Sequence, residues 1–249
     1  MLFLVGVGVS VLIGVSLGLL GGGGSILTVP TIHYVFGVEA HAAITSSLLI
    51  VGVTSLVALV PHLRARRVRG RIGLVFGGAS MLSAYGAGRL SRLVSPTVLL
   101  IAFGAMMVVA AVAMLRPRTR EAPPRASLVA LVVQGLAVGA VTGFVGAGGG
   151  FVIVPALVVI VGLSMPEAVA TSLLVIAMNS FVAFGATVGA VALDGRVIAA
   201  VLIAAIAGGA AGGMVAGRVP AARLRRGFGW FVLAMAAVVL GTELARLIV

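Results

Sequence analysis

Cysteine and lysine are both absent from this chain of 249 residues, and only five residues are acidic. The absence of cysteine excludes disulfide bonds, thiolate metal ligands and a cysteine nucleophile. The three histidines and the five acids have no spacing typical of metal ligands, so we predict no metal site. No residue pattern typical of acid–base or nucleophilic catalysis is visible either. The sequence therefore predicts neither an enzyme nor a bound cofactor.

Charge of either sign is scarce. Charged residues make up 9% of the chain, against about 25% in a typical soluble domain. Hydrophobic residues make up 61%, and the mean hydropathy is +1.31. Such a chain has no surface compatible with water. We predict an all-α, polytopic integral membrane protein of about 8–10 transmembrane or half-spanning helices.

Apolar runs of two lengths follow one another along the chain. The long runs are Leu2–Leu20, Ala42–Val60, Ile72–Ala87, Pro96–Leu115, Leu128–Val145, Ala168–Leu193, Val197–Ala216 and Phe228–Leu240 with its continuation to Val249. Two short runs, Ile26–Phe36 and Phe151–Val161, would each cover about 17 Å as helices, roughly half of a bilayer core. We expect these to be half-helices, re-entrant segments or parts of broken helices. The first long run has no basic n-region or cleavage site, so we expect a retained span and not a signal peptide.

One glycine–proline phrase, G-x2-G-x-G-G-x5-P, occurs twice between apolar runs. Its copies are Gly18, Gly21, Gly23, Gly24 and Pro30, and Gly143, Gly146, Gly148, Gly149 and Pro155. Further matched pairs follow: Thr45-Ser46 with Thr171-Ser172, Gly70-Arg71 with Gly195-Arg196, and Gly88-Arg89 with Gly217-Arg218. We predict two homologous transmembrane halves, residues 1–115 and 127–249, joined by an exposed linker at 116–126.

All 17 basic residues are arginines, and most stand in clusters between apolar runs. The longest polar stretch is too short for a basic nucleic-acid-binding domain, so we predict no nucleic-acid partner. Clustered arginines instead indicate topology and attraction to anionic membrane lipid. If the short runs cross the membrane, the halves are inverted and the three large clusters share one side. The positive-inside rule favours this arrangement over parallel halves, with the N-terminus outside and the linker in the cytoplasm.

The glycine phrases are our candidate substrate site. If the segment after each phrase is helical, its first N–H groups are free and the helix dipole favours an anion there. Glycine lets a substrate approach the backbone closely, and the prolines limit helix continuity. The candidate binding residues are Gly22, Gly23, Gly24, Ser25, Gly148, Gly149 and Gly150, with helix breaks at Pro30 and Pro155. The alternative is that the glycines serve close helix packing.

Hydroxyl and amide side chains extend this candidate site. Thr45, Ser46, Thr171 and Ser172 begin matched spans and can donate to an anion, although such hydroxyls can equally bond to their own helix. Asn179 shares a helix face with Ser172, where it lines the site or bridges helices.

Titratable residues cluster after the first short run. We list His33, Glu39 and His41 as candidates for proton coupling, against the alternative of ordinary solvated groups near a membrane boundary. His62 stands beside an arginine-rich segment, where we expect a loop residue.

The duplicated phrase, the Thr-Ser pair and the Gly-Arg step resemble the sulfite exporter TauE/SafE family over nearly the whole chain. The resemblance implies transport of sulfite, thiosulfate, small organosulfonates or related carboxylates across the bacterial plasma membrane. It does not transfer a particular substrate or a direction. The absence of cysteine is a departure from some distant thiosulfate transporters, and it argues against their cysteine-based mechanism.

From these observations we predict a multi-pass secondary transporter of a small anion, working by alternating access around the two glycine breaks. The alternatives are a transporter of a neutral or cationic solute and a membrane scaffold that transports nothing. The oligomeric state is not predicted.

Overall fold

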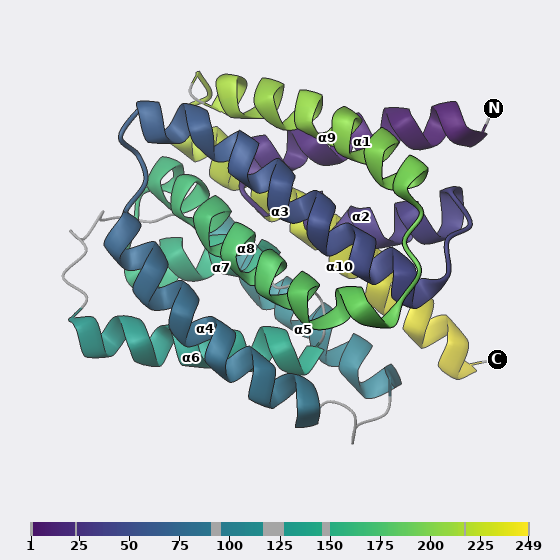
Figure 1. Cartoon of the computed structure of the whole chain (residues 1–249). Coiled ribbons are helices and arrows are strands. Elements are labelled where there is room, and N and C mark those ends of the chain that lie inside the picture. The colour runs from purple at the N-terminus through teal and green to yellow at the C-terminus, as the bar shows by residue number, and fades with distance from the viewer. Residues whose placement is uncertain are drawn as a thin grey trace.

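The computed structural model of the chain describes residues 2–22, 24–90, 96–116, 127–145, 150–216 and 218–248. Within these ranges every regular element is a helix (Figure 1). The α-helices are α1 (Leu2–Leu20), α2 (Gly24–Pro30), α3 (Ala40–Arg64), α4 (Gly70–Leu90), α5 (Pro96–Leu115), α6 (Leu128–Val145), α7 (Gly150–Pro155), α8 (Met165–Thr187), α9 (Gly195–Ala216) and α10 (Ala221–Ile248). The all-α fold predicted from composition is therefore confirmed.

Long and short helices occur in the same order twice. Each series has one long helix, one short helix that continues as a π-helix, and three more long helices. The π-helices are η1 (Thr31–Val35) and η3 (Ala156–Val161), and a short 3₁₀ turn, η4 (Val188–Ala190), follows α8. Four helical segments are long and apolar enough to cross a membrane: His41–Arg64, Met165–Gly185, Gly195–Ala216 and Ala221–Thr242. Shorter apolar helical segments accompany them.

The two prolines of the repeated phrase stand where regular α-helix ends, but the helical path of the chain continues beyond them. Pro30 and Pro155 close the α-helical part, and the chain continues directly as η1 and η3. A proline ring removes one helical N–H and crowds the preceding turn, and a wider π turn accommodates this without breaking the helix. The break in the first half lies instead at Gly21 and Gly22, between α1 and α2.

Both short helical segments lie inside the protein. Thr28 and Ile32 in the first, and Val154 and Leu157 in the second, are completely buried. The two short helices α2 and α7 also contact each other. Irregular backbone at membrane depth is tolerated only where protein or a cavity surrounds it. The arrangement of both short segments satisfies this condition.

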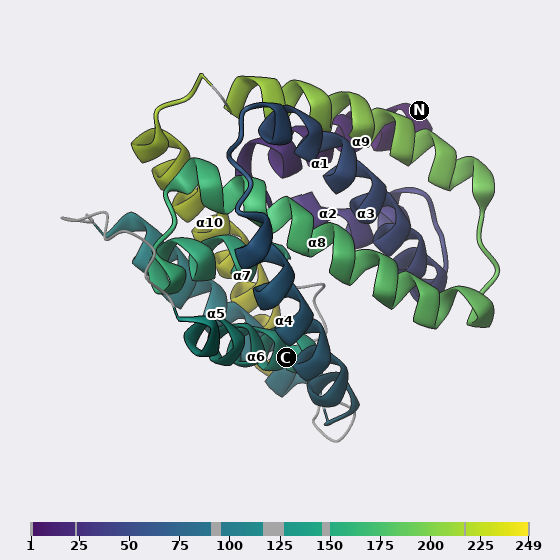
Figure 2. The ribbon, with the colours of Figure 1, turned by 60° about the vertical axis from the view of Figure 1, so that its left-hand side comes forward.

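The two halves exchange helices instead of folding side by side. The first helix of each half packs along the fourth helix of the other, so α1 lies against α9 and α6 lies against α4 (Figures 1 and 2). The helices that correspond to each other also pair, α3 with α8 and α5 with α10. The same contact pattern is therefore obtained when the halves are interchanged.

Glycine residues allow α1 and α9, and likewise α4 and α6, to approach each other closely. A Cβ atom at Gly14 would collide with the carbonyl oxygen of Ala205, and one at Gly139 with the carbonyl oxygen of Ser80. The two collisions occupy matching positions in the repeat. Backbones approach this closely only where small residues line a helix interface.

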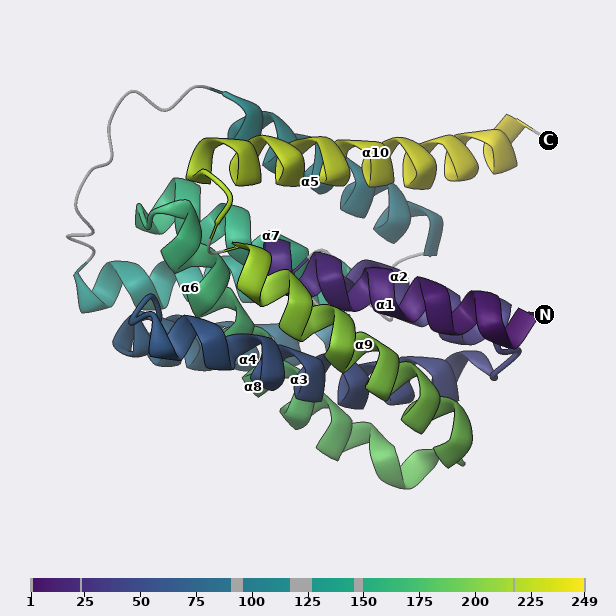
Figure 3. The same cartoon turned by 90° about the horizontal axis from the view of Figure 1, so that it is seen from above.

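The corresponding helices α5 and α10 run in opposite directions. Gly104 in the first half of α5 lies beside Leu240 in the second half of α10, whereas Gly229 in the first part of α10 lies beside Leu115 at the end of α5. These two helices are therefore antiparallel. The α3–α4 and α9–α10 connections lie at one end of the bundle, and the N- and C-termini lie at the other (Figures 1 and 3).

Candidate functional site

The first glycine phrase forms a tight turn against the second half of the chain. Gly21 has a φ of +73°, its N–H donates to the carbonyl of Leu17 at 2.8 Å, and its carbonyl accepts from Ser172 Oγ at 3.0 Å. A Cβ atom at Gly21 would lie 2.6 Å from Ser172 Oγ and 2.9 Å from the backbone of Val169. Both the backbone conformation and the lack of space require glycine here.

The turn sends α2 back along α1. Gly24 is buried where it begins α2, and a Cβ atom there would lie 2.9 Å from the Leu17 side chain. Gly22 completes the turn and is also buried. For these two glycines the structure gives a packing role, which is compatible with a site at the turn but does not require one.

The second phrase falls mostly outside the described residues. Gly148 and Gly149 belong to that part, as does Gly23 of the first phrase, and the side chain of Ser25 is not described. Gly150 is buried and begins α7. Since α7 contacts α2, the two short helices belong to one region of the bundle.

The predicted hydroxyls are all buried. Thr45, Ser46, Thr171 and Ser172 expose 2% or less of their surface. Ser172 Oγ bonds to its own helix at Val169 O (2.8 Å), which is one of the two alternatives foreseen for such hydroxyls, and it also bonds to Gly21 of the other half. Thr171 Oγ1 accepts from the backbone N–H of Arg69 at 3.1 Å and keeps its own proton for donation.

Asn179 lies two turns after Ser172 on α8 and is half-buried. Its Oδ1 is buried without a hydrogen-bond partner among the described residues, and so is Oε1 of Gln134 on α6. A buried amide oxygen without a partner is costly, so a donor from solvent, substrate or another conformation is needed there.

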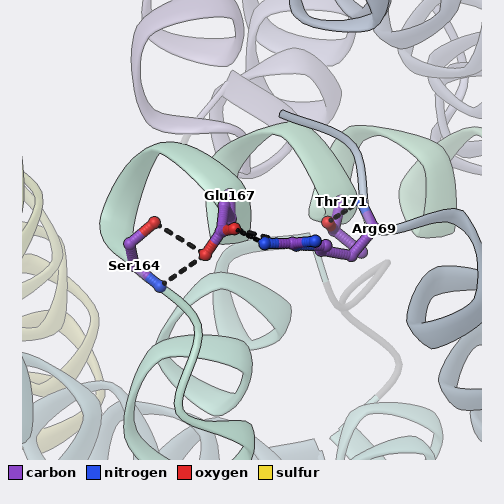
Figure 4. Close-up of polar contacts among 4 residues, drawn as sticks. All are labelled: Arg69, Ser164, Glu167 and Thr171. Carbon is purple, nitrogen blue, oxygen red and sulfur yellow. Dashed lines mark hydrogen bonds and ion pairs between the residues drawn. The ribbon is translucent and has the colours of Figure 1, made fainter. Parts of the chain in front are cut away.

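An ion pair that the sequence analysis missed ties the halves together beside Thr171 (Figure 4). Arg69, in the α3–α4 connection, donates from Nε to Glu167 Oε1 at 2.8 Å. Glu167 also accepts from the backbone N–H (3.2 Å) and the hydroxyl (2.8 Å) of Ser164, in a capping box that begins α8. The Ser-x-x-Glu spacing was a readable signal for the helix start, although its arginine partner stands 98 residues away.

The Gly21–Ser172 contact and the Arg69–Glu167 ion pair both lie toward the N-terminal end of α8. Val169 and Ser172 are four and seven residues beyond Met165, the first residue of the helix, so Gly21 packs about 6 to 11 Å from that end. The α3–α4 connection and its arginines mark one end of the bundle, which we call the arginine-rich end. The Gly21 turn is therefore nearer this end than the middle of a membrane core of about 30 Å.

The candidates for proton coupling lie around the connection between η1 and α3, with His33 in η1, Glu39 at the end of the connection and His41 in the first turn of α3. His33 Nδ1 lies 2.8 Å from the carbonyl of Val38, and its ring meets Tyr34 edge-on at 4.7 Å. Glu39 caps α3 by accepting from the Ala42 N–H at 3.1 Å. Hydrogen bonds from the backbone N–H groups of His41 and Ala42 lower the pKa of Glu39. His41 itself is exposed.

His62 is not a loop residue, contrary to our expectation. It lies in the last turn of α3 and is 2% exposed. The neighbouring arginines suggested a solvated segment, but α3 continues through Pro61 to Arg64, and the histidine ring turns inward while Leu63 and Arg64 face outward.

The helices beside the first glycine phrase pack closely. A gap between α1, α2, α3 and α9, lined by Leu17, Thr28 and Thr54 among others, is too narrow to hold a water molecule. A surface depression of about 440 Å³, lined by Val68 to Ile72, opens at the arginine-rich end.

Comparison with known proteins agrees with this architecture. The family described as sulfite exporter TauE/SafE matches residues 6–239. A probable membrane transporter protein of Xylella fastidiosa (strain Temecula1 / ATCC 700964) is 32% identical over 98% of this chain and 97% of its own length. The probable membrane transporter protein YdhB of Bacillus subtilis (strain 168) is 24% identical over 66% of this chain and 70% of its own. No solved structure matches. With its long apolar helices and this match over nearly its whole length, the chain is a multi-pass membrane protein that belongs to the sulfite exporter TauE/SafE family of membrane transporters.

Proposed function

We propose that the protein is a secondary transporter of a small anion, such as sulfite or an organosulfonate, in the bacterial plasma membrane. The observation that carries the proposal is the contact between the Gly21 turn of one half and Ser172 of the other. The description of the family supports the choice of substrate class.

Backbone and hydroxyl donors are the chemistry we propose for the site. The helical segment from Gly24 through Val35 has free N–H groups in its first turn, and its dipole favours negative charge there. Thr171 retains a hydroxyl proton, and Ser172 can redirect its own from Gly21 to a substrate. Together these donors would replace the water around an anion without a buried cationic side chain.

Alternating access follows from the symmetry that we propose for the halves. The interchangeable contact pattern and the antiparallel α5 and α10 support an inverted repeat. In transporters built this way, one arrangement of the halves opens to one side of the membrane and its mirror arrangement to the other. The narrow gap between α1, α2, α3 and α9 supports an occluded state between the two.

Thermal unfolding of the purified protein with sulfite, sulfate, thiosulfate, sulfonates, carboxylates and neutral amino acids tests the proposal. A ligand stabilises the folded state by RT ln(1 + [L]/Kd), so even millimolar binding is measurable. We expect a shift from one or more anions that weakens in Ser172→Ala. Ser10→Ala is the matched control, because Ser10 is equally buried and bonds only to its own helix at Gly6. An anion shift that is unchanged in Ser172→Ala would remove Ser172 from the site.

A neutral or cationic solute is the second candidate. Gly21 presents a carbonyl to Ser172, and Asn179 has a buried oxygen without a partner, and both oxygens suit a donor-bearing solute. Stabilisation by a neutral amino acid with no response to any anion would favour it. A complete absence of response would favour the third alternative, a scaffold in which the glycines serve packing alone.

A further inference from the structure

The least satisfied polar side chain in the described part of the protein is His62. Only 2% of its surface is exposed, and neither ring nitrogen makes a hydrogen bond of good geometry among the described residues, although the Gly18 backbone is close enough to interact with the ring. A neutral imidazole carries one donor and one acceptor, so even with a weak bond to Gly18 at least one of them is unused. A protein interior normally pairs such groups, and an unpaired one indicates another state in which it finds a partner.

The position of the ring connects it with the candidate site. His62 lies beside the backbone of Gly18, the first glycine of the repeated phrase. The preceding residue, Pro61, packs near Gly213 of α9, which itself approaches Gly18. The ring therefore stands where α1, α3 and α9 meet, beside Gly18, which precedes Gly21 by three residues.

Two hydroxyls continue from His62 into the bundle. Thr54 Oγ1 and Ser55 Oγ are also buried and also lack a hydrogen-bond partner within the described ranges. They precede His62 on α3 by eight and seven residues, so they lie on the same side of the helix about 11 Å deeper. Thr54 also lines the narrow gap that includes Thr28 of α2.

We propose that His62 binds and releases the coupling proton of the transport cycle, with Ser55 and Thr54 on its path toward the centre of the bundle. The free ring nitrogen accepts a proton from solution at the arginine-rich end and becomes an imidazolium. The same proton leaves toward the opposite side when the protein changes conformation. A proton that travels with a monovalent anion makes the transfer electrically neutral. Ionisable groups inside membrane spans commonly have this kind of role.

Among the described residues, few other charges act on the ring. Arg67 in the α3–α4 connection is the charged side chain whose field reaches it. Neither α1 nor α2 contains a titratable residue, and the only one in α9, Arg196, stands in its first turn at the far end. On α8 the titratable residue is Glu167, which is paired with Arg69, and on η1 they are His33 and Tyr34, at the opposite end of α3.

Histidine protonation can be observed without transport. The chain has three histidines, so protein labelled with ¹⁵N-histidine has three imidazoles to follow, and His62→Gln identifies one of them. We expect the His62 signal to change from the neutral to the imidazolium form as the pH is lowered. A His62 signal that stays unchanged at every pH at which the protein remains folded would overturn the inference whatever the transport result. Thermal unfolding of His62→Gln and His62→Asn checks that the variants are folded.

Coupling is tested in proteoliposomes that contain a pH-sensitive dye and are driven by a sulfite or methanesulfonate gradient. We expect anion-driven proton flux in the wild type and in Ser10→Ala, a buried control outside the proposed site, and a loss of about tenfold or more in His62→Gln. Anion-for-anion exchange, which needs no net proton movement, should survive in that variant. Equal proton flux in the wild type and His62→Gln would overturn the inference. This inference rests on the proposed transport function, and an absence of all anion flux in the wild type would count against that function and not against His62 protonation.

Discussion

At the scale of single residues, glycine has two separate roles that the sequence does not distinguish. Gly21 and Gly37 both have positive φ, at +73° and +69°. A side chain at Gly21 would press on Val169 and Ser172, whereas a Cβ atom at Gly37 would meet nothing within 4 Å. One glycine is required by backbone conformation and space together, and the other by conformation alone.

Alanine substitution separates these roles. Gly37→Ala should lower the free energy of unfolding by about 1–2 kcal/mol, the cost of a left-handed conformation for a residue with a Cβ atom. Gly21→Ala should cost a further 1–3 kcal/mol or so, because the interface with α8 must move apart. Thermal unfolding in detergent measures both. Equal losses in the two variants would mean that the Gly21 turn is not packed against α8.

At the scale of helices, hydropathy predicted most of the elements and some of their ends. The bounds of α1, α5 and α6 agree with the predicted runs to the residue. The predicted run Ala168–Leu193 is wrong at its end, since α8 stops at Thr187 while apolar residues continue through η4. Hydropathy indicates which segments lie in the membrane, but it does not predict the backbone hydrogen-bond pattern within them. For the same reason it could not predict the π-helices η1 and η3.

The arginines at the start of α10 caused us to place the beginning of this helix too late in the sequence. The predicted run began at Phe228, but the helix begins seven residues earlier, at Ala221. Arg225 lies in this early part, and its guanidinium donates from Nε to the carbonyl of Met114 at 2.7 Å near the end of α5. A cation at the carbonyl end of a helix is favourable, so this charge belongs to a helix contact and not to a loop. The Ser172–Gly21 contact of the candidate site was equally unpredictable, because it joins residues 151 positions apart.

The exchanged helix pairs can be tested on α1 alone. Gly14→Ala would push a Cβ atom into the carbonyl of Ala205 on α9, whereas Gly8 has open space around it. We expect Gly14→Ala to destabilise the protein by about 1–3 kcal/mol through overpacking. Gly8→Ala should be neutral or slightly stabilising, because alanine is the better helix former. Similar unfolding temperatures for the two variants would contradict the close packing of α1 on α9.

At the scale of the whole molecule, the halves depend on each other. Each supplies its first helix to the fourth helix of the other, so neither half has a complete interface alone. The repeat itself was readable in the sequence, but this exchange was not, because a repeated motif does not say which copies make contact. The glycine spacing was the available signal: Gly14 with Gly18 on one side, and Gly208 with Gly212 on the other.

The orientation of the halves in the membrane is the remaining prediction, and cysteine labelling decides it. The chain has no native cysteine, so the unmodified protein provides a control without background. We expect Arg66→Cys, in the α3–α4 connection, and Arg226→Cys, in the second turn of α10, to react with an impermeant maleimide from the same side, because the α3–α4 and α9–α10 connections share one end of the bundle (Figure 3). Asp194→Cys, in the α8–α9 connection, should react from the opposite side. All three positions are exposed, so burial does not limit the reaction.

An inverted repeat requires this pattern, since corresponding connections must then face opposite solutions. Labelling of Arg66→Cys and Asp194→Cys from the same side would instead require parallel halves, and the anion site would lose the symmetry on which alternating access depends.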